Sequence, residues 1–339
     1  MGARRLQPHV TMQQRLATTH QKGAALLMAM LTVALVAVLA SAALWQQWRT
    51  LSVETAERDA QQTAWLLRGA QDWASVVLRE DGRSGSIDHL AEPWAVPLRE
   101  ARLSTFLAAG SNGAVSETES LTQQVYLSGR ITDMQSRLNM TNLLDGNKLN
   151  ELSLIAFARL YRALGLPDTE LRQWTTALLA AAQTPPAANA ALLPQRFEQL
   201  RWLGLSAKSL ARLSPHMTVL PTRTPVNLNT ASAEVLYASV PGLELQQAQQ
   251  WANERASQPF DNLEAVRTRM GQAAVNINDS QHAVNTRYFE VTGQLRHGQV
   301  YQLQKSLIQR DGKDTKTIWR EQRGLRSEPG CLSTIPPPC

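Results

Sequence analysis

Residues 23–45 read Gly-Ala-Ala-Leu-Leu-Met-Ala-Met-Leu-Thr-Val-Ala-Leu-Val-Ala-Val-Leu-Ala-Ser-Ala-Ala-Leu-Trp and contain no charged side chain. With a rise of about 1.5 Å per residue, a helix over residues 24–45 is about 33 Å long, which matches the hydrocarbon thickness of a bilayer. The residues before this run include four basic side chains and no acidic one. This bias predicts a single membrane pass with a cytoplasmic N-terminus and an external C-terminal part.

The helical pattern continues beyond the apolar run. Small and apolar residues recur at spacings of three to four as far as Val77, and Asp81-Gly82 then interrupts the pattern. We therefore expect one helix from about Ala24 to about Arg79. A cleaved secretory signal peptide is the alternative, but its apolar region would span only about 7–15 residues. A plain membrane anchor is the other alternative.

Composition limits the function of the part that follows. The chain has 339 residues, of which 43% are hydrophobic and 18% charged, which excludes wholesale disorder and a multi-span transporter. The length allows roughly two domains beyond the first segment. The formal net charge is +6, and four of the basic residues lie within the first 23 positions. The rest of the chain therefore lacks the strongly basic charge that is typical of a nucleic-acid-binding protein.

The periodicity of the outer part predicts an α+β fold. Residues 124–131 alternate as a strand does. Residues 149–213 are helical, and five apolar residues fall broadly on one face of the first helix: Leu152, Ile155, Ala156, Leu160 and Leu164. Three further alternating segments, 287–295, 300–308 and 315–321, predict an antiparallel meander. Because strands flank the helical block on both sides, we expect the helices to form a domain inserted into the sheet protein.

A second motif lies within the helical block. Val226-Asn-Leu-Asn-Thr-Ala-Ser-Ala-Glu-Val-Leu236, Val240-Pro-Gly-Leu243 and Pro259-Phe-Asp-Asn-Leu-Glu-Ala-Val266 resemble a helix-hairpin-helix repeat over residues 225–271. Such units often bind DNA phosphates through hairpin N–H groups, so a membrane-anchored periplasmic DNA-binding protein is the alternative function. Glu244 stands where a second hairpin glycine is expected, and the unit has three arginines against five acids. We therefore expect a structural unit and no nucleic-acid partner.

No pattern predicts an enzyme. The sequence contains no Walker loop, dinucleotide fingerprint, nucleophile elbow or His-Glu-x-x-His motif, and its six histidines lack ligand spacing. Asp311 and Asp314 are weak calcium candidates, with a solvated hairpin turn as the simpler interpretation. Cys331 and Cys339 predict a disulfide if this end lies outside the cytosol, with two free thiols as the alternative. Three tryptophans in helical segments are expected in the core: Trp174, Trp202 and Trp251.

Two stretches carry a resemblance to a known family. Gln21-Lys22-Gly23 followed by Ala24 resembles the leader of type IV pilins and type II secretion pseudopilins, which a peptidase cuts after the glycine. Most members have glutamate at the fifth mature position, which is Met28 here; the minor pseudopilin K family characteristically lacks it. Residues 131–143 resemble a stretch typical of that family, and we expect a salt bridge between Asp133 and Arg137 there.

The resemblance implies a pilin-like fold, in which a long N-terminal helix packs on an antiparallel sheet, with a large inserted all-α domain. The implied segments are a cytoplasmic leader (1–23), a transmembrane part (24–45), the first part of the body (46–145), the inserted helical domain (146–284), the second part of the sheet (285–325) and a C-terminal tail (326–339). The implied location is the bacterial inner membrane, with the bulk of the chain in the periplasm.

The resemblance also implies a function. The chain would lie at the tip of the type II secretion pseudopilus and would start and limit pseudopilus assembly for export of folded proteins across the outer membrane. Implied partners are the minor pseudopilins I and J, the major pseudopilin, prepilin peptidase, the inner-membrane secretion assembly, and secreted substrates or the outer-membrane secretin. No cofactor is required; calcium is a family feature, but residues 184–194 lack the aspartate-rich segment that many relatives have near here.

Overall fold

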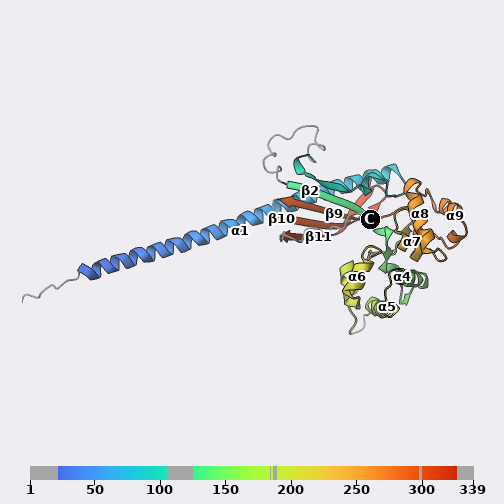
Figure 1. Ribbon diagram of the computed structural model, residues 1–339, viewed down its shortest axis with the longest axis horizontal. Helices are drawn as coiled ribbons and strands as arrows, with labels where there is room; N and C mark the ends of the chain where they lie inside the picture. Colours follow the sequence, from blue (N-terminus) through green and yellow to red (C-terminus); the bar gives the residue numbers. More distant parts are fainter. Residues whose placement is uncertain (1–21, 106–124, 184, 186–188, 298–299, 327–339) are drawn as a thin grey trace, which may run out of the picture. The chain divides into compact units, whose positions relative to one another are not determined.

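The computed structural model describes residues 22–105, 125–183, 185, 189–297 and 300–326 (Figure 1). The chain divides into two units, residues 1–62 and residues 63–339, which are described separately below.

Helix α1, Lys22–Ser84, runs through both units. Among the described residues it is the one helix long and apolar enough to cross a membrane. The expected long helix is confirmed, but it ends five residues beyond Arg79. Gly82 explains the difference: its Cα approaches the turn after β10 so closely that a Cβ would lie 2.5 Å from the Gly312 carbonyl oxygen. A larger residue would not fit there, so glycine here allows close packing and does not end the helix.

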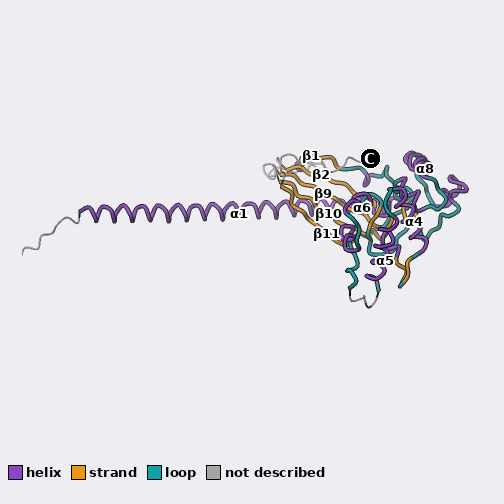
Figure 2. Tube along the Cα trace, turned by 60° about the horizontal axis from the view of Figure 1, so that its bottom comes forward, coloured by secondary structure: helices purple, strands orange, loops and turns teal. Residues whose placement is uncertain are grey.

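The expected antiparallel sheet is confirmed, with strand order β1-β2-β9-β10-β11 (Figure 2). The strands are β1 Leu98–Arg102, β2 Val125–Asp133, β9 Tyr288–His297, β10 Val300–Asp311 and β11 Asp314–Arg326. Side chains of α1, including Leu67, Ala74 and Leu78, are buried against one face of this sheet. Since β2 pairs with β9 along its whole length, the chain between them is an insertion.

Helices dominate the inserted part (Figure 1). They are α4 Glu151–Ala163, α5 Asp168–Ala182, α6 Ala207–Leu213, α7 Ala233–Ser239, α8 Leu245–Ser257 and α9 Leu263–Met270. The short 3-10 helices of the chain are η1 Pro93–Ala95, η2 Met134–Ser136, η3 Met140–Leu143, η4 Phe197–Leu203 and η5 Gly271–Ala274. The limits 146–284 for the inserted domain stay a prediction.

Three two-stranded pairs accompany the helices. Parallel pairs join β3 Leu138–Asn139 to β6 Met217–Thr218, and β7 Val226–Asn227 to β8 His282–Ala283. An antiparallel pair joins β4 Leu144–Asp145 to β5 Lys148–Leu149. In each parallel pair, a strand at one end of the insertion pairs with a strand from its middle: β3 near the start with β6, and β8 near the end with β7.

Two expectations about the helical core were partly wrong. On the expected face of α4, Ala156 and Leu160 are buried, whereas Leu152 and Ile155 are about half exposed, because the helix turns Phe157 and Tyr161 inward. Of the three tryptophans, Trp174 and Trp251 are buried as expected, whereas Trp202 is 42% exposed. The larger aromatic side chains therefore determine which face of α4 is buried.

Prediction for Gly129. Gly129 lies in β2, opposite Gly293 of β9. A Cβ at Gly129 would lie 2.8 Å from the Thr292 carbonyl oxygen of β9. We expect Gly129→Ala to lower the free energy of unfolding by about 1–3 kcal/mol, because the paired backbones must separate. Gly324→Ala is the matched control, since nothing lies within 4 Å of its Cβ position. Thermal unfolding of both variants measures the effect, and equal midpoints would contradict it.

Candidate functional site

A buried polar cluster joins the sheet to the helical insertion. Asp133, at the end of β2, accepts hydrogen bonds from Asn227 Nδ2 (2.9 Å), Thr230 Oγ1 (2.5 Å) and the Gln135 N–H (2.7 Å). Asn227 and Thr230 belong to the turn that opens the helix-hairpin-helix unit. One carboxylate therefore fixes the start of that unit against the end of the central strand.

Arg310 of β10 extends this cluster to the end of α1. Its guanidinium donates to Asp81 (2.6 Å) and to Asp88 (2.5 Å). Asp88 also accepts from the Thr286 N–H, while its backbone carbonyl accepts from Asn227 Nδ2. We call Asp81, Asp88, Asp133, Asn227, Thr230 and Arg310 the junction cluster.

Burial dominates the electrostatics of the junction cluster. It raises the pKa of Asp133 to about 6, against the hydrogen bond from Thr230, which lowers it. Burial also raises the pKa of Asp81, although the hydrogen bond and charge of Arg310 act in the opposite direction. The expected salt bridge between Asp133 and Arg137 was wrong: no such pair forms among the described residues, and neutral donors satisfy Asp133 instead.

Carboxylates gather at one place among the described residues. Oxygens of Asp81, Asp88 and Glu92 lie within 4.8 Å of one another. Arg310 donates to both aspartates, and Glu92 accepts from Trp94 Nε1 (2.6 Å) and the His89 N–H (2.9 Å). Arginine thus supplies the positive charge that these buried acids require.

The calcium candidates lie elsewhere, at the turn between β10 and β11. Asp311 forms an ion pair with Arg287 and accepts from Gln309 Nε2 (2.6 Å), and Asp314 is exposed. A calcium site at these two residues stays a prediction.

The helix-hairpin-helix unit uses its hairpin groups internally. Ser232 caps α7, and Gly242 has a φ of +90°, as the motif requires. The Leu243 N–H donates to the Val240 carbonyl (3.2 Å), and the Glu244 N–H donates to Gln247 Oε1 (3.1 Å). Asn276 Nδ2 covers the hairpin by donating to the Pro241 carbonyl (2.7 Å). These N–H groups are thus engaged within the fold and are not presented to a phosphate.

The three arginines of this unit are engaged as well. Arg255 is buried and donates to the Leu228 and Ala231 carbonyls. Arg269 donates to the Gln258 carbonyl (2.7 Å), and Arg267 pairs with Glu264 and Asp279. These side chains hold the unit together and leave it without a cationic surface for DNA.

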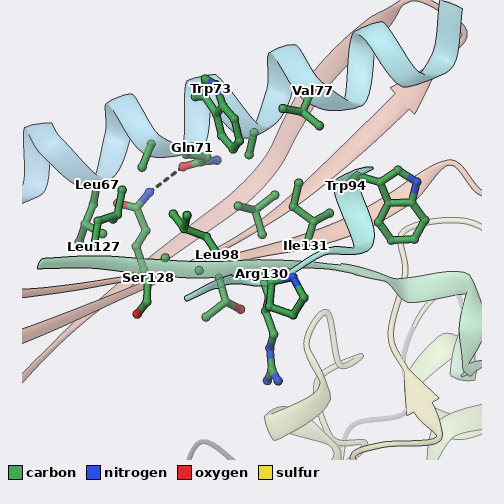
Figure 3. A pocket seen from close by; sticks show the side chains of 18 of the residues that line it. Leu67, Gln71, Trp73, Val77, Trp94, Leu98, Leu127, Ser128, Arg130 and Ile131 are labelled. Carbon is green, nitrogen blue, oxygen red and sulfur yellow. Dashed lines mark hydrogen bonds between the residues drawn. The ribbon is translucent and has the colours of Figure 1, made fainter. Parts of the chain in front are cut away.

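A cavity of about 270 Å³ lies between α1 and the sheet (Figure 3). Gly129 and Gly293 face each other across β2 and β9, so no side chain fills the space beneath Ala70 and Ala74. Gln304 Nε2 donates to Gln71 Oε1 (2.7 Å) at its edge. The lining contains no carboxylate, imidazole or thiol, and its hydroxyl groups are those of Ser128 and Thr292.

The remaining predicted site residues lie at the two ends of the chain. Gly23, Ala24 and Met28 lie in the first turns of α1 and are exposed. Cleavage after Gly23 and the role of Met28 stay predictions. Cys331 and Cys339 lie outside the described residues. Sequence reasoning missed the junction cluster, since Asp88 and Arg310 are 222 positions apart.

Comparisons with known proteins agree along most of the chain. Residues 226–285 match a family model described as type II secretion system (T2SS), protein K, and residues 136–222 match a second model of the same description. The chain is 28% identical to type II secretion system protein K of Pseudomonas aeruginosa over 324 residues, covering 87% of this chain and 90% of that protein. The Klebsiella pneumoniae protein of that name is also 28% identical, over 335 residues, covering 88% and 96%.

A solved structure has the same fold. It is the crystal structure of the GspK-GspI-GspJ complex from the enterotoxigenic Escherichia coli type 2 secretion system, with a TM-score of 0.58 and 17% sequence identity. The match covers 79% of this chain and 98% of that chain.

Prediction for Asp133. Because its folded pKa of about 6 lies above its ordinary value of 3.8, the protonated form stabilises the fold. That contribution is complete below about pH 3.8 and is lost as the pH rises through 6, a change of about 3 kcal/mol. Asp133→Asn removes this titration. We therefore expect the unfolding free energy of wild type, relative to the variant, to fall by about 2.4 kcal/mol between pH 4 and pH 7, because at pH 4 part of the contribution is already lost.

Denaturant unfolding at both pH values measures this change. Asp314→Asn, at an exposed turn position, is the control and should leave the stability within about 0.5 kcal/mol at both. A constant difference between wild type and Asp133→Asn across this range would contradict the assignment.

Proposed function

We propose that this chain, which belongs to the type II secretion system protein K family, is the minor pseudopilin at the tip of the pseudopilus, where it starts and limits assembly. Met28 carries the proposal. A carboxylate in a membrane helix is costly unless it is paired, and in the filament the usual glutamate is thought to meet the amino terminus of a neighbouring subunit. A subunit with no neighbour above it needs no such acid, and methionine at this position fits that place.

The helical insertion supports the same place in the assembly. It adds six described helices to one pilin-like body, and the junction cluster fixes the start of its helix-hairpin-helix unit to the sheet. A subunit that carries such bulk would obstruct addition of a further subunit above it. The mechanism is thus packing: the apolar part of α1 exchanges lipid neighbours for the helices of other subunits, which van der Waals contact makes feasible.

We propose the minor pseudopilins I and J as direct partners, since the fold neighbour was solved in a complex of GspK, GspI and GspJ. The major pseudopilin, prepilin peptidase and the inner-membrane secretion assembly follow from the same role, with secreted substrates or the secretin as further contacts. The body would lie in the periplasm, anchored through the apolar part of α1. The role is structural, as that of the family is, and requires no catalytic group.

The DNA-binding alternative lacks support from the hairpin. The Leu243 and Glu244 N–H groups already donate within the fold, and the three arginines of the unit donate to carbonyls or pair with acids. A phosphate would have to displace these contacts beside Glu244.

Prediction for the leader. In cells that contain prepilin peptidase, we expect the membrane-extracted protein to begin at Ala24, and Gly23→Leu to retain residues 1–23 because the side chain obstructs the cleavage position. Intact-mass spectrometry distinguishes the two species. Gly69→Leu, at an exposed glycine of the same helix with nothing within 4 Å, is the control and should be processed normally. A wild-type protein that keeps its first 23 residues would contradict the proposal.

Prediction for assembly. Co-expression with minor pseudopilins I and J of the same secretion system should give a stable complex that contains all three proteins, measured by size-exclusion chromatography with light scattering. Deletion of this chain should stop secretion, and plasmid-borne wild type should restore it. Failure to form the complex, together with normal secretion in the deletion strain, would reject the proposed role.

A further inference from the structure

The five-stranded sheet has a long edge at β11. This strand pairs with β10 on one side and with no other described strand on the other (Figure 2). Alternate N–H and C=O groups of β11 therefore point away from the sheet without a strand partner. Such an edge is a template for another strand, and proteins usually shorten, cover or charge it.

The regular part of this edge is long enough to receive a strand. From Leu307–Trp319 to Val300–Arg326 the pairing with β10 continues without a register shift, and Ile318 forms a bulge before it. The eight residues Trp319–Arg326, which we call the β11 edge, exceed the usual strand length of about five to six. The bulge separates them from the turn at Asp314.

The charge along β11 is positive. The strand's exposed cationic side chains are Lys316, Arg320 and Arg323, and its two acids are Asp314 and Glu321. Glu321 already lies between two arginines, with Arg196 Nη1 at 3.1 Å and Arg323 Nε at 2.6 Å. Arg320 donates to the uncharged Gln71 amide oxygen. Glu321 is thus shared by two arginines, and Lys316 and Arg320 form no ion pair within the described part of the chain.

This charge selects between occupants. A second copy of β11 would bring arginines against arginines, which is unfavourable across neighbouring strands. A strand with glutamate or aspartate side chains would gain the backbone hydrogen bonds and would also place opposite charges beside these cations.

We propose that the β11 edge is a docking site for an extended acidic segment of another protein, which adds to the sheet as a sixth strand. The backbone of Trp319–Arg326 supplies the binding, and the cationic side chains of Arg320 and Arg323, together with Lys316 just beyond the bulge, supply the preference for acids. This inference does not depend on the proposed place at the pseudopilus tip.

The test uses the full chain in detergent and two synthetic eight-residue peptides, one alternating glutamate with valine and the other alternating lysine with valine. We expect the acidic peptide to bind at least about tenfold more tightly than the basic one, and more weakly at high salt. Hydrogen–deuterium exchange should show slower exchange of backbone amides within residues 319–326 only when the acidic peptide is bound. Equal binding of both peptides, or unchanged exchange in this segment, would overturn the proposal.

Charge variants separate strand addition from general attraction to a basic protein. Lys316→Glu combined with Arg323→Glu should weaken binding of the acidic peptide at least about tenfold. Arg99→Glu, at an exposed position of the opposite edge strand β1, is the control and should change it less than about twofold. An equal loss in both variants would also reject the site.

Discussion

Arg310 is buried between Asp81 and Asp88, and the arrangement of the body depends on this contact. An arginine cannot leave water without several kcal/mol of compensation, so its carboxylates must be in place when β10 packs. One carboxylate belongs to the end of α1 and the other to the segment that follows it. Because Asn227 donates to the Asp88 carbonyl and to Asp133, the same contact also sets the position of the helical insertion. Helix, sheet and insertion therefore meet at one buried polar cluster.

The insertion follows from the sheet topology. β2 and β9 pair in register from Val125–His297 to Asp133–Phe289, although more than 150 residues separate them in the chain. Closing so long a loop is entropically unfavourable, but the added loss grows only with the logarithm of loop length. The short parallel pairs β3–β6 and β7–β8 hold the neck of the insertion near the sheet. A compact helical core then replaces what would otherwise be a long open loop.

Local patterns predicted the elements but not their junctions. The apolar run, the alternating strands and the Pro-Gly hairpin each depend on neighbours within about ten residues, and all were found. Face selection in α4 failed in part because two stripes compete, and Phe157 and Tyr161 outweigh Leu152 and Ile155. The inner face of β10 carries Gln302, Gln304 and Ser306, so a hydrophobicity pattern cannot identify it as buried. Contacts such as Asp88–Arg310 join distant positions and leave no periodic signal.

The helix-hairpin-helix unit illustrates why function must be argued from the site and not from the motif. Its capping serine and positive-φ glycine have the geometry of helix-hairpin-helix units that bind DNA phosphates. Here Gln247 accepts from the Glu244 N–H and Asn276 donates to the Pro241 carbonyl, both at the surface, and Arg255 reaches inward to carbonyls of the turn at residues 228–231. The same backbone therefore serves packing once its donors are consumed within the fold. Because the turn at residues 227–230 also contacts Asp133, this unit attaches the insertion to the pilin-like body.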